Sequence, residues 1–146
     1  MSDSDDTERS GARAPRFDGT TEKWRYFKKQ MESHLARLGL GELLVESTGG
    51  TILKDTDTAT GTDDEKKEKE RLRKANRKAA GILLNSISID TKDGQADFQL
   101  IEKWHNAKDG YVGGHFYKEW EALIERHEEL ESKTVHDLRK STMNAR

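Results

Sequence analysis

Histidines are the side chains in this sequence best suited to bind metals or transfer protons near neutral pH. The chain has five of them, His34, His105, His115, His127 and His136. The segment HEELE at 127–131 has Glu131 where the zinc-protease helix motif H-E-x-x-H needs its second histidine, so that motif is absent. His127 and Glu131 are spaced to clip a metal on one helix face, although such pairs are more often features of a helix surface or edge. His34 and His105 flank apolar stripes, which predicts partly buried structural side chains.

Other patterns associated with chemistry fail at their decisive positions. Counted from Asp55 as a calcium loop, the acidic stretch has Ala59, Thr60 and Lys66 where a ligand, a glycine and a glutamate are needed. The glycine-rich segments 49–51 and 110–115 lack the G-K-[ST] ending of a phosphate loop. The chain has no cysteine, which excludes thiolate catalysis and cysteine-ligated zinc in this sequence. We therefore expect a protein that is not an enzyme, with no catalytic residue, metal, cofactor or small-molecule substrate.

The segment 66–78 is strongly basic, with eight Lys or Arg against two Glu. A helix with such a face could contact nucleic-acid phosphates. The candidate contact residues are Lys66, Lys67, Arg73, Lys74, Arg77 and Lys78. The simpler interpretation, which we favour, is an exposed charged helix with internal ion pairs. No aromatic RNA-binding signature accompanies the segment.

Composition favours solvated helices over a thin core. Of 146 residues, 37% are charged and 32% hydrophobic, yet the net charge is only −2, so the two signs nearly balance. No apolar stretch marks a secretory signal, and no run of about 20 apolar residues could span a membrane. We expect no membrane partner.

Apolar periodicity and capping signals predict an all-α bundle of about five to six helices, with a disordered N-terminal tail and one long loop. The first expected helix covers 20–38 and ends at a Gly39 C-cap, and a short helix at 40–46 follows it. The next helix covers 63–86 and starts after a Thr62 capping box. Two more helices cover 95–107 and 115–131, and a further helix starts from a Ser132 or Thr134 cap. Residues 47–62 form the long loop. Gly81 is expected to allow a neighbouring helix to approach closely.

These elements predict three regions: a disordered tail at 1–15, a helical domain at 16–131, and the truncated start of a further helix at 132–146. Trp24, Trp104 and Trp120 lie on three different expected helices, which predicts a core shared by their rings.

The stretch RFDGTTEKWRYFKKQMESHLARLGLGELL, starting at residue 16, resembles the start of the Gag capsid region of copia-type LTR retrotransposons. The segments KANRKAAGILLNSI and EWEALIERHEELESKTVHDLRK resemble later helices of that family in the same order, so the likeness covers about 16–143. The signature and core positions that we take from this resemblance and from the apolar stripes are Phe17, Gly19, Trp24, Phe27, Met31, Leu35, Leu38, Trp104, Trp120 and Leu123. The family's CCHC zinc knuckle is not in this cysteine-free chain.

The resemblance implies a non-enzymatic capsid-like structural protein that forms homo-oligomers and virus-like particles in the cytoplasm. It also implies packaging of element RNA, through regions downstream or weakly through the basic helix. Two alternatives stay open: a helical nucleic-acid-binding module that uses 66–78, and a small helical enzyme or metal protein that uses His105, His115 and His127.

Overall fold

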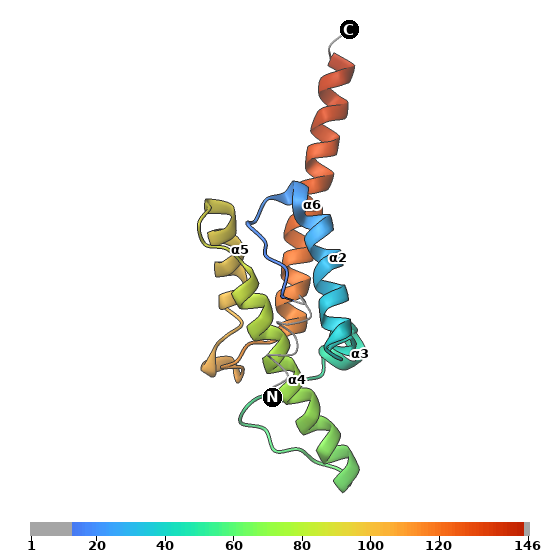
Figure 1. Cartoon of the computed structure of the whole chain (residues 1–146), viewed down its shortest axis with the longest axis vertical. Coiled ribbons are helices and arrows are strands. Elements are labelled where there is room, and N and C mark those ends of the chain that lie inside the picture. The colour runs from blue at the N-terminus through green and yellow to red at the C-terminus, as the bar shows by residue number, and fades with distance from the viewer. Residues whose placement is uncertain (1–12, 145–146) are drawn as a thin grey trace.

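The structure is a computed structural model that describes residues 13–144, with side chains described as far as Lys133. Its elements are the α-helices α2 (Thr21–Arg37), α3 (Glu46–Gly49), α4 (Asp63–Ser86), α5 (Lys92–Glu102) and α6 (Phe116–Asn144), and the 3-10 turns η1 (Gly41–Leu44) and η2 (Ala107–Asp109) (Figure 1). The all-α prediction is confirmed for this part of the chain. The expected tail at 1–15 lies mostly outside the described residues.

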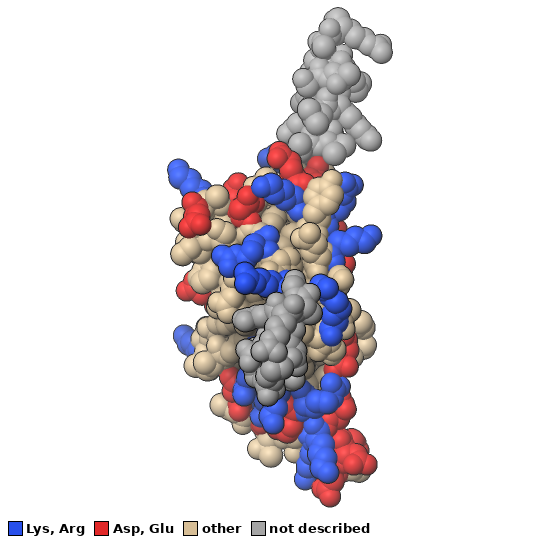
Figure 2. Space-filling view, in the orientation of Figure 1, with Lys and Arg blue, Asp and Glu red and all other residues tan. Residues whose placement is uncertain are grey.

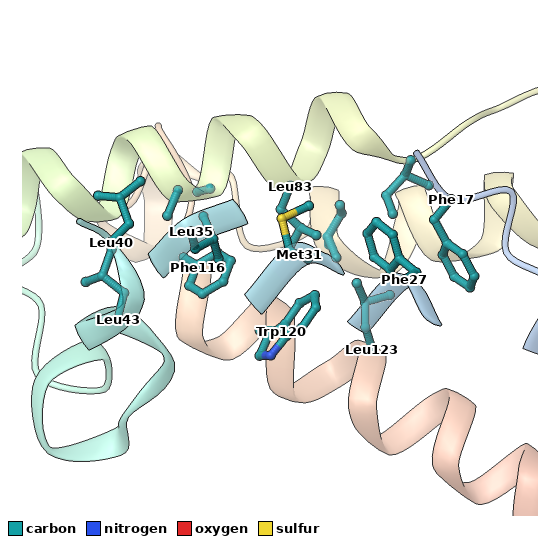
Figure 3. Packing of buried hydrophobic residues seen from close by; sticks show 14 of the residues in the cluster. Phe17, Phe27, Met31, Leu35, Leu40, Leu43, Leu83, Phe116, Trp120 and Leu123 are labelled. Carbon is teal, nitrogen blue, oxygen red and sulfur yellow. The ribbon is translucent and has the colours of Figure 1, made fainter. Parts of the chain in front are cut away.

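Helix α6 packs against α2, α4 and α5, so it is the central element of the bundle. Figure 1 shows its C-terminal part extending past the ends of α2 and α5. The apolar stripes of α2, α4 and α6 meet in one core, part of which is drawn in Figure 3. Trp24, Met31, Leu83 and Trp120 are at most 2% exposed.

Local capping signals define where two helices begin and end. Thr62 Oγ1 accepts a hydrogen bond from the Glu65 N–H at 3.2 Å, and Glu65 Oε1 accepts one from the Thr62 N–H at 3.4 Å, so the predicted capping box is confirmed. At the end of α2, Gly39 has φ +75°, and the Leu40 N–H donates to the Leu35 carbonyl at 2.8 Å. This is the expected glycine C-cap with Leu40 folded back onto the last turn.

Three predicted boundaries are wrong. Helix α6 continues through Ser132 and Thr134 without a break, because cap-forming residues do not end a helix where neither Gly nor Pro interrupts it. Helix α5 starts at Lys92 and not at 95, because Thr91 Oγ1 accepts a hydrogen bond from the Gly94 N–H at 2.9 Å. The segment 40–46 forms a 3-10 turn followed by the separate helix α3.

Two predicted packing contacts are also absent. A Cβ atom at Gly81 would meet nothing within 4 Å, so no neighbouring helix approaches there. Trp104 lies beyond the end of α5, is only half-buried, and is not part of the cluster that contains Trp24 and Trp120. The early end of α5 explains this, because the chain turns away before the helical stripe reaches residue 104.

Candidate functional site

The signature positions are mostly core positions. Phe17, Trp24, Phe27, Met31, Leu35, Trp120 and Leu123 are buried, Leu38 packs against them half-buried, and Trp104 lies apart. The Phe17 ring stacks on Phe27 with centroids 4.7 Å apart and an interplanar angle of 12°. Its backbone N–H donates to the Ser86 carbonyl at 2.9 Å, and its carbonyl accepts from the Ser88 N–H at 2.8 Å. Phe17 therefore attaches the N-terminal coil to the end of α4.

Gly19 makes the second attachment of this motif. Its φ is +87°, and a Cβ atom there would lie 2.3 to 2.6 Å from the backbone of Asp93 and Gly94. Thr91 Oγ1 donates to the Asp18 carbonyl at 2.5 Å. Hydrogen bonds from Thr20 to the Asp18 carboxylate lower the pKa of Asp18 to about 2. The motif thus joins α2 to the start of α5, and it has a structural function here.

His127 belongs to a buried network of polar side chains, which was not predicted from the sequence. Its Nδ1 is 2.9 Å from Thr21 Oγ1, and its Nε2 is 2.8 Å from Asp97 Oδ2. Arg126 Nε lies 2.9 Å from the other Asp97 oxygen. The His127 ring also stacks on Trp24, with centroids 5.0 Å apart and an interplanar angle of 17°. These contacts join α2, α5 and α6.

The order hydroxyl, imidazole, carboxylate is that of a hydrolase triad, but the surroundings favour a structural network. His127 and Asp97 have no exposed surface. None of the grooves described below is lined by Thr21, His127 or Asp97. Both ring nitrogens of His127 are engaged, so the metal clip with Glu131 is not formed, and His127 lies in the core rather than at a helix surface.

A second polar cluster lies under the connector between α5 and α6. His105 Nε2 is 2.9 Å from Glu119 Oε1, and burial raises the pKa of Glu119. Burial lowers the pKa of neighbouring His115. The Asn76 side chain donates to the Gly114 carbonyl and accepts from the Phe116 N–H, each at 2.8 Å, which fixes the connector against α4.

The histidines of the enzyme hypothesis are therefore inside the protein. His115 and His127 are buried and His105 is half-buried, but His127 shares no hydrogen-bond partner with the other two. His34 is buried, and burial lowers its pKa. His136 lies beyond the described side chains. Among the described residues, no three His, Asp or Glu side chains are arranged to hold a metal ion.

The six basic candidates of α4 do not form one surface. At 3.6 residues per turn, Lys66, Arg73 and Arg77 share one face. There the Arg73 guanidinium donates to the Asp57 carbonyl at 2.6 Å, and Arg77 Nη2 lies 3.0 Å from Asp55 Oδ1. These two arginines hold the 50–62 loop against the helix.

Lys67, Lys74 and Lys78 occupy another face of α4 and are exposed. Their stripe is about 16 Å long. The adjacent Arg71 pairs with Glu42 and Glu68. Figure 2 shows Lys and Arg intermixed with Asp and Glu toward the lower end of the molecule, where α4 begins. Of the six candidates on α4, Arg73 and Arg77 are therefore engaged by the loop, whereas Lys66, Lys67, Lys74 and Lys78 are exposed.

A groove of about 970 Å³ runs between α5 and α6. The apolar side chains that line it include Leu100, Trp104 and Leu130, and Leu130 is 38% exposed. The charged side chains that line it carry both signs, namely Lys103, Lys118, Arg126 and Lys133 with Glu121, Glu125 and Glu129. We call this surface the α5/α6 groove. Protein–protein contacts commonly have an apolar centre and a polar rim.

In the part of the chain that the structure describes, no helix is both long and apolar enough to cross a membrane. Compared with protein-family models, curated proteins and solved structures, the chain shows no match.

Proposed function

We propose that this protein is a non-enzymatic, self-associating structural module of the Gag capsid type, which forms intracellular particles around retrotransposon RNA. Two things support the proposal. One is the order of the motifs in the sequence. The other, which carries the self-association, is the α5/α6 groove.

The groove can receive a second copy of the same chain because its lining carries both signs of charge. In a two-fold symmetric contact, the same patch meets itself, so each lysine needs a glutamate on that same patch. The α6 side of the groove carries Lys118, Glu121, Glu125, Glu129 and Lys133 along one stripe. Because both ends of this stripe are basic and its middle is acidic, a two-fold contact offset along α6 sets a lysine of one copy against a glutamate of the other, whereas a surface of one sign would repel its copy in every register. The exposed Leu130 supplies apolar area for the centre of such a contact.

Sedimentation velocity over a wide range of protein concentrations tests the self-association. The triple variant Glu121→Lys, Glu125→Lys, Glu129→Lys makes the rim wholly basic and should remain monomeric. The triple variant Lys103→Glu, Lys118→Glu, Lys133→Glu makes the lysine positions acidic and should also remain monomeric. An equimolar mixture of the two should associate again, because unlike charges then face each other.

The apolar part is tested with Leu130→Glu, which should weaken association at least about tenfold through loss of buried apolar contact. Val45→Glu is the matched control, because Val45 is also exposed, at 53%, and does not line the groove. A strictly monomeric wild-type protein at high concentration and low salt, where charge pairing is least screened, would overturn the proposal. Negative-stain microscopy of the associated fraction tests whether it forms particles.

A second candidate function is nucleic-acid binding through α4, which the exposed stripe Lys67, Lys74 and Lys78 favours. The variant that replaces all three lysines by glutamine should then reduce both the affinity for RNA and its salt dependence. Unchanged binding by that variant would eliminate α4 as the contact.

A further inference from the structure

The outer face of α2 and the coil before it enclose a groove of about 790 Å³ with an unusual charge distribution. Four of its lining side chains are basic, and none is acidic. The basic ones are Arg13, Arg25, Lys29 and Arg37. We call this surface the α2 groove. It differs from the α5/α6 groove and from α4, where both signs occur together.

The spacing on α2 explains how the groove forms. Arg25, Lys29, Ser33 and Arg37 recur every four residues, so they follow one stripe about 18 Å long. Arg25, Lys29 and Arg37 are exposed, and none of the ion pairs between described residues involves them. In Figure 2, Lys and Arg gather over α2 and the coil that precedes it. This face therefore presents positive charge that the described residues leave uncompensated.

An exposed aromatic ring lies in the middle of this charge. Tyr26 is 60% exposed, and it is the most accessible aromatic side chain among the described residues. The Arg25 guanidinium carbon lies 5.1 Å from the centre of its ring, and Arg25 Nη2 donates to Tyr26 Oη at 3.2 Å. Tyr26 and Gln30 also line an adjoining groove that contains Arg16, Lys23 and Asp18. Lys23 is paired with Asp18 there at 3.2 Å, so Arg16 is the basic side chain that this groove adds beside the ring.

We infer that the α2 groove binds single-stranded nucleic acid. Uncompensated Lys and Arg side chains attract phosphates, and an exposed tyrosine beside an arginine offers a platform on which an unpaired base can stack. A duplex keeps its bases stacked within the helix and cannot use that platform. An anionic membrane fits less well, because this face has no apolar side chains to insert beyond Tyr26.

This surface is independent of the α5/α6 groove, so RNA binding here and self-association can succeed or fail separately. Its residues come from the coil at 13–15 and from α2, and only the fold brings Arg13 into the same groove as the basic side chains of α2. The basic segment 66–78, which is the candidate contact that the sequence offers, has two of its arginines engaged by the 50–62 loop.

Fluorescence anisotropy with a labelled oligouridylate of about 20 nucleotides tests the inference on the full chain. The variant Arg25→Gln, Lys29→Gln, Arg37→Gln should weaken binding at least tenfold at low salt. Its slope of log affinity against log salt should fall by about 2, since three phosphate contacts at about 0.7 each are lost. The matched control is Lys54→Gln, Lys92→Gln, Lys108→Gln, which removes the same charge from exposed positions outside α4 and both grooves and should change affinity less than about threefold.

The stacking part of the inference is tested at Tyr26. Tyr26→Ala should weaken binding about tenfold, and Tyr26→Phe should retain it, because the ring and not the hydroxyl forms the platform. Duplex RNA and anionic vesicles should compete poorly with the single strand. All substituted side chains are exposed, and circular dichroism of each variant is the control for its folding.

Three results would overturn the inference. If the control variant loses as much affinity as the α2 variant, the contact is not specific to the α2 groove. If Tyr26→Ala binds like wild type, or duplex and vesicles compete equally, the surface attracts polyanions in general and has no preference for single strands. If wild-type binding is undetectable or independent of salt, the groove has no function in binding nucleic acid.

Discussion

Replacing Gly19, Gly39 or Gly81 by alanine separates the effect of local backbone conformation on stability from the effect of tertiary packing. Gly19 has φ +87°, and a Cβ atom there would lie 2.3 Å from the Asp93 backbone. Gly39 has φ +75°, but a Cβ atom would meet nothing within 4 Å. Gly81 lies inside α4, also with nothing within 4 Å. The same added methyl group therefore meets three different environments.

The expected magnitudes follow from these environments. Gly39→Ala forces alanine into the left-handed region and should cost about 1–2 kcal/mol. Gly19→Ala has that cost and also displaces backbone at the start of α5, which adds about 1–3 kcal/mol by analogy with overpacking. Gly81→Ala should stabilise by about 0.5–1 kcal/mol, because alanine is the better helix former and has room. Against a total stability of about 5–15 kcal/mol, these differences are easily measured.

Urea unfolding followed by tryptophan fluorescence is the assay, because Trp24 and Trp120 are buried in the core and should report its loss. From the most to the least stable, the order should be Gly81→Ala, wild type, Gly39→Ala and Gly19→Ala. Gly19→Ala being no less stable than Gly39→Ala would show that the Gly19 motif is not packed closely on α5. A destabilised Gly81→Ala would mean that a neighbour does approach α4 at that point.

Three further predictions concern the polar side chains of the His127 network and of the His105–Glu119 cluster. Asp97→Ala should lower the free energy of unfolding by about 3–5 kcal/mol, because it removes the carboxylate that faces His127 and Arg126 in the core. A decrease below about 1 kcal/mol in urea unfolding would contradict that network. Thr21→Val should cost about 1 kcal/mol through the single hydrogen bond to His127, and an unchanged urea midpoint would show that this bond contributes nothing. Burial raises the pKa of Glu119 above 4.5, so the folded state holds the proton to higher pH than the unfolded state does. The stabilisation from this group is therefore complete below pH 4.5 and is lost as the pH rises through the raised pKa. Wild type should therefore lose stability relative to Glu119→Gln as the pH rises above 4.5 through the raised pKa, and parallel pH profiles of the two proteins would refute this.

Features that depend on neighbouring residues in the chain could be predicted from the sequence. The Thr62–Glu65 capping box and the Gly39 C-cap were predicted because their partners lie within a few residues. The apolar stripe of α2 was predicted because a period of three and four residues already determines which side of a helix faces the core. For the same reason, the all-α class could be predicted.

The candidate surfaces depended on contacts between residues far apart in the chain. Arg77 is engaged by Asp55, 22 residues away, and His127 by Asp97, 30 residues away, so neither partner could be recognised from local spacing. The basic run of α4 is conspicuous in the sequence, yet folding places part of it against a loop. The positive charge that remains uncompensated lies on α2, where the packing of the N-terminal coil brings Arg13 to the helix. Sequence determines which residues are charged and which face of a helix they share, but only tertiary packing decides which charges find a partner, because ion pairing depends on distance in space.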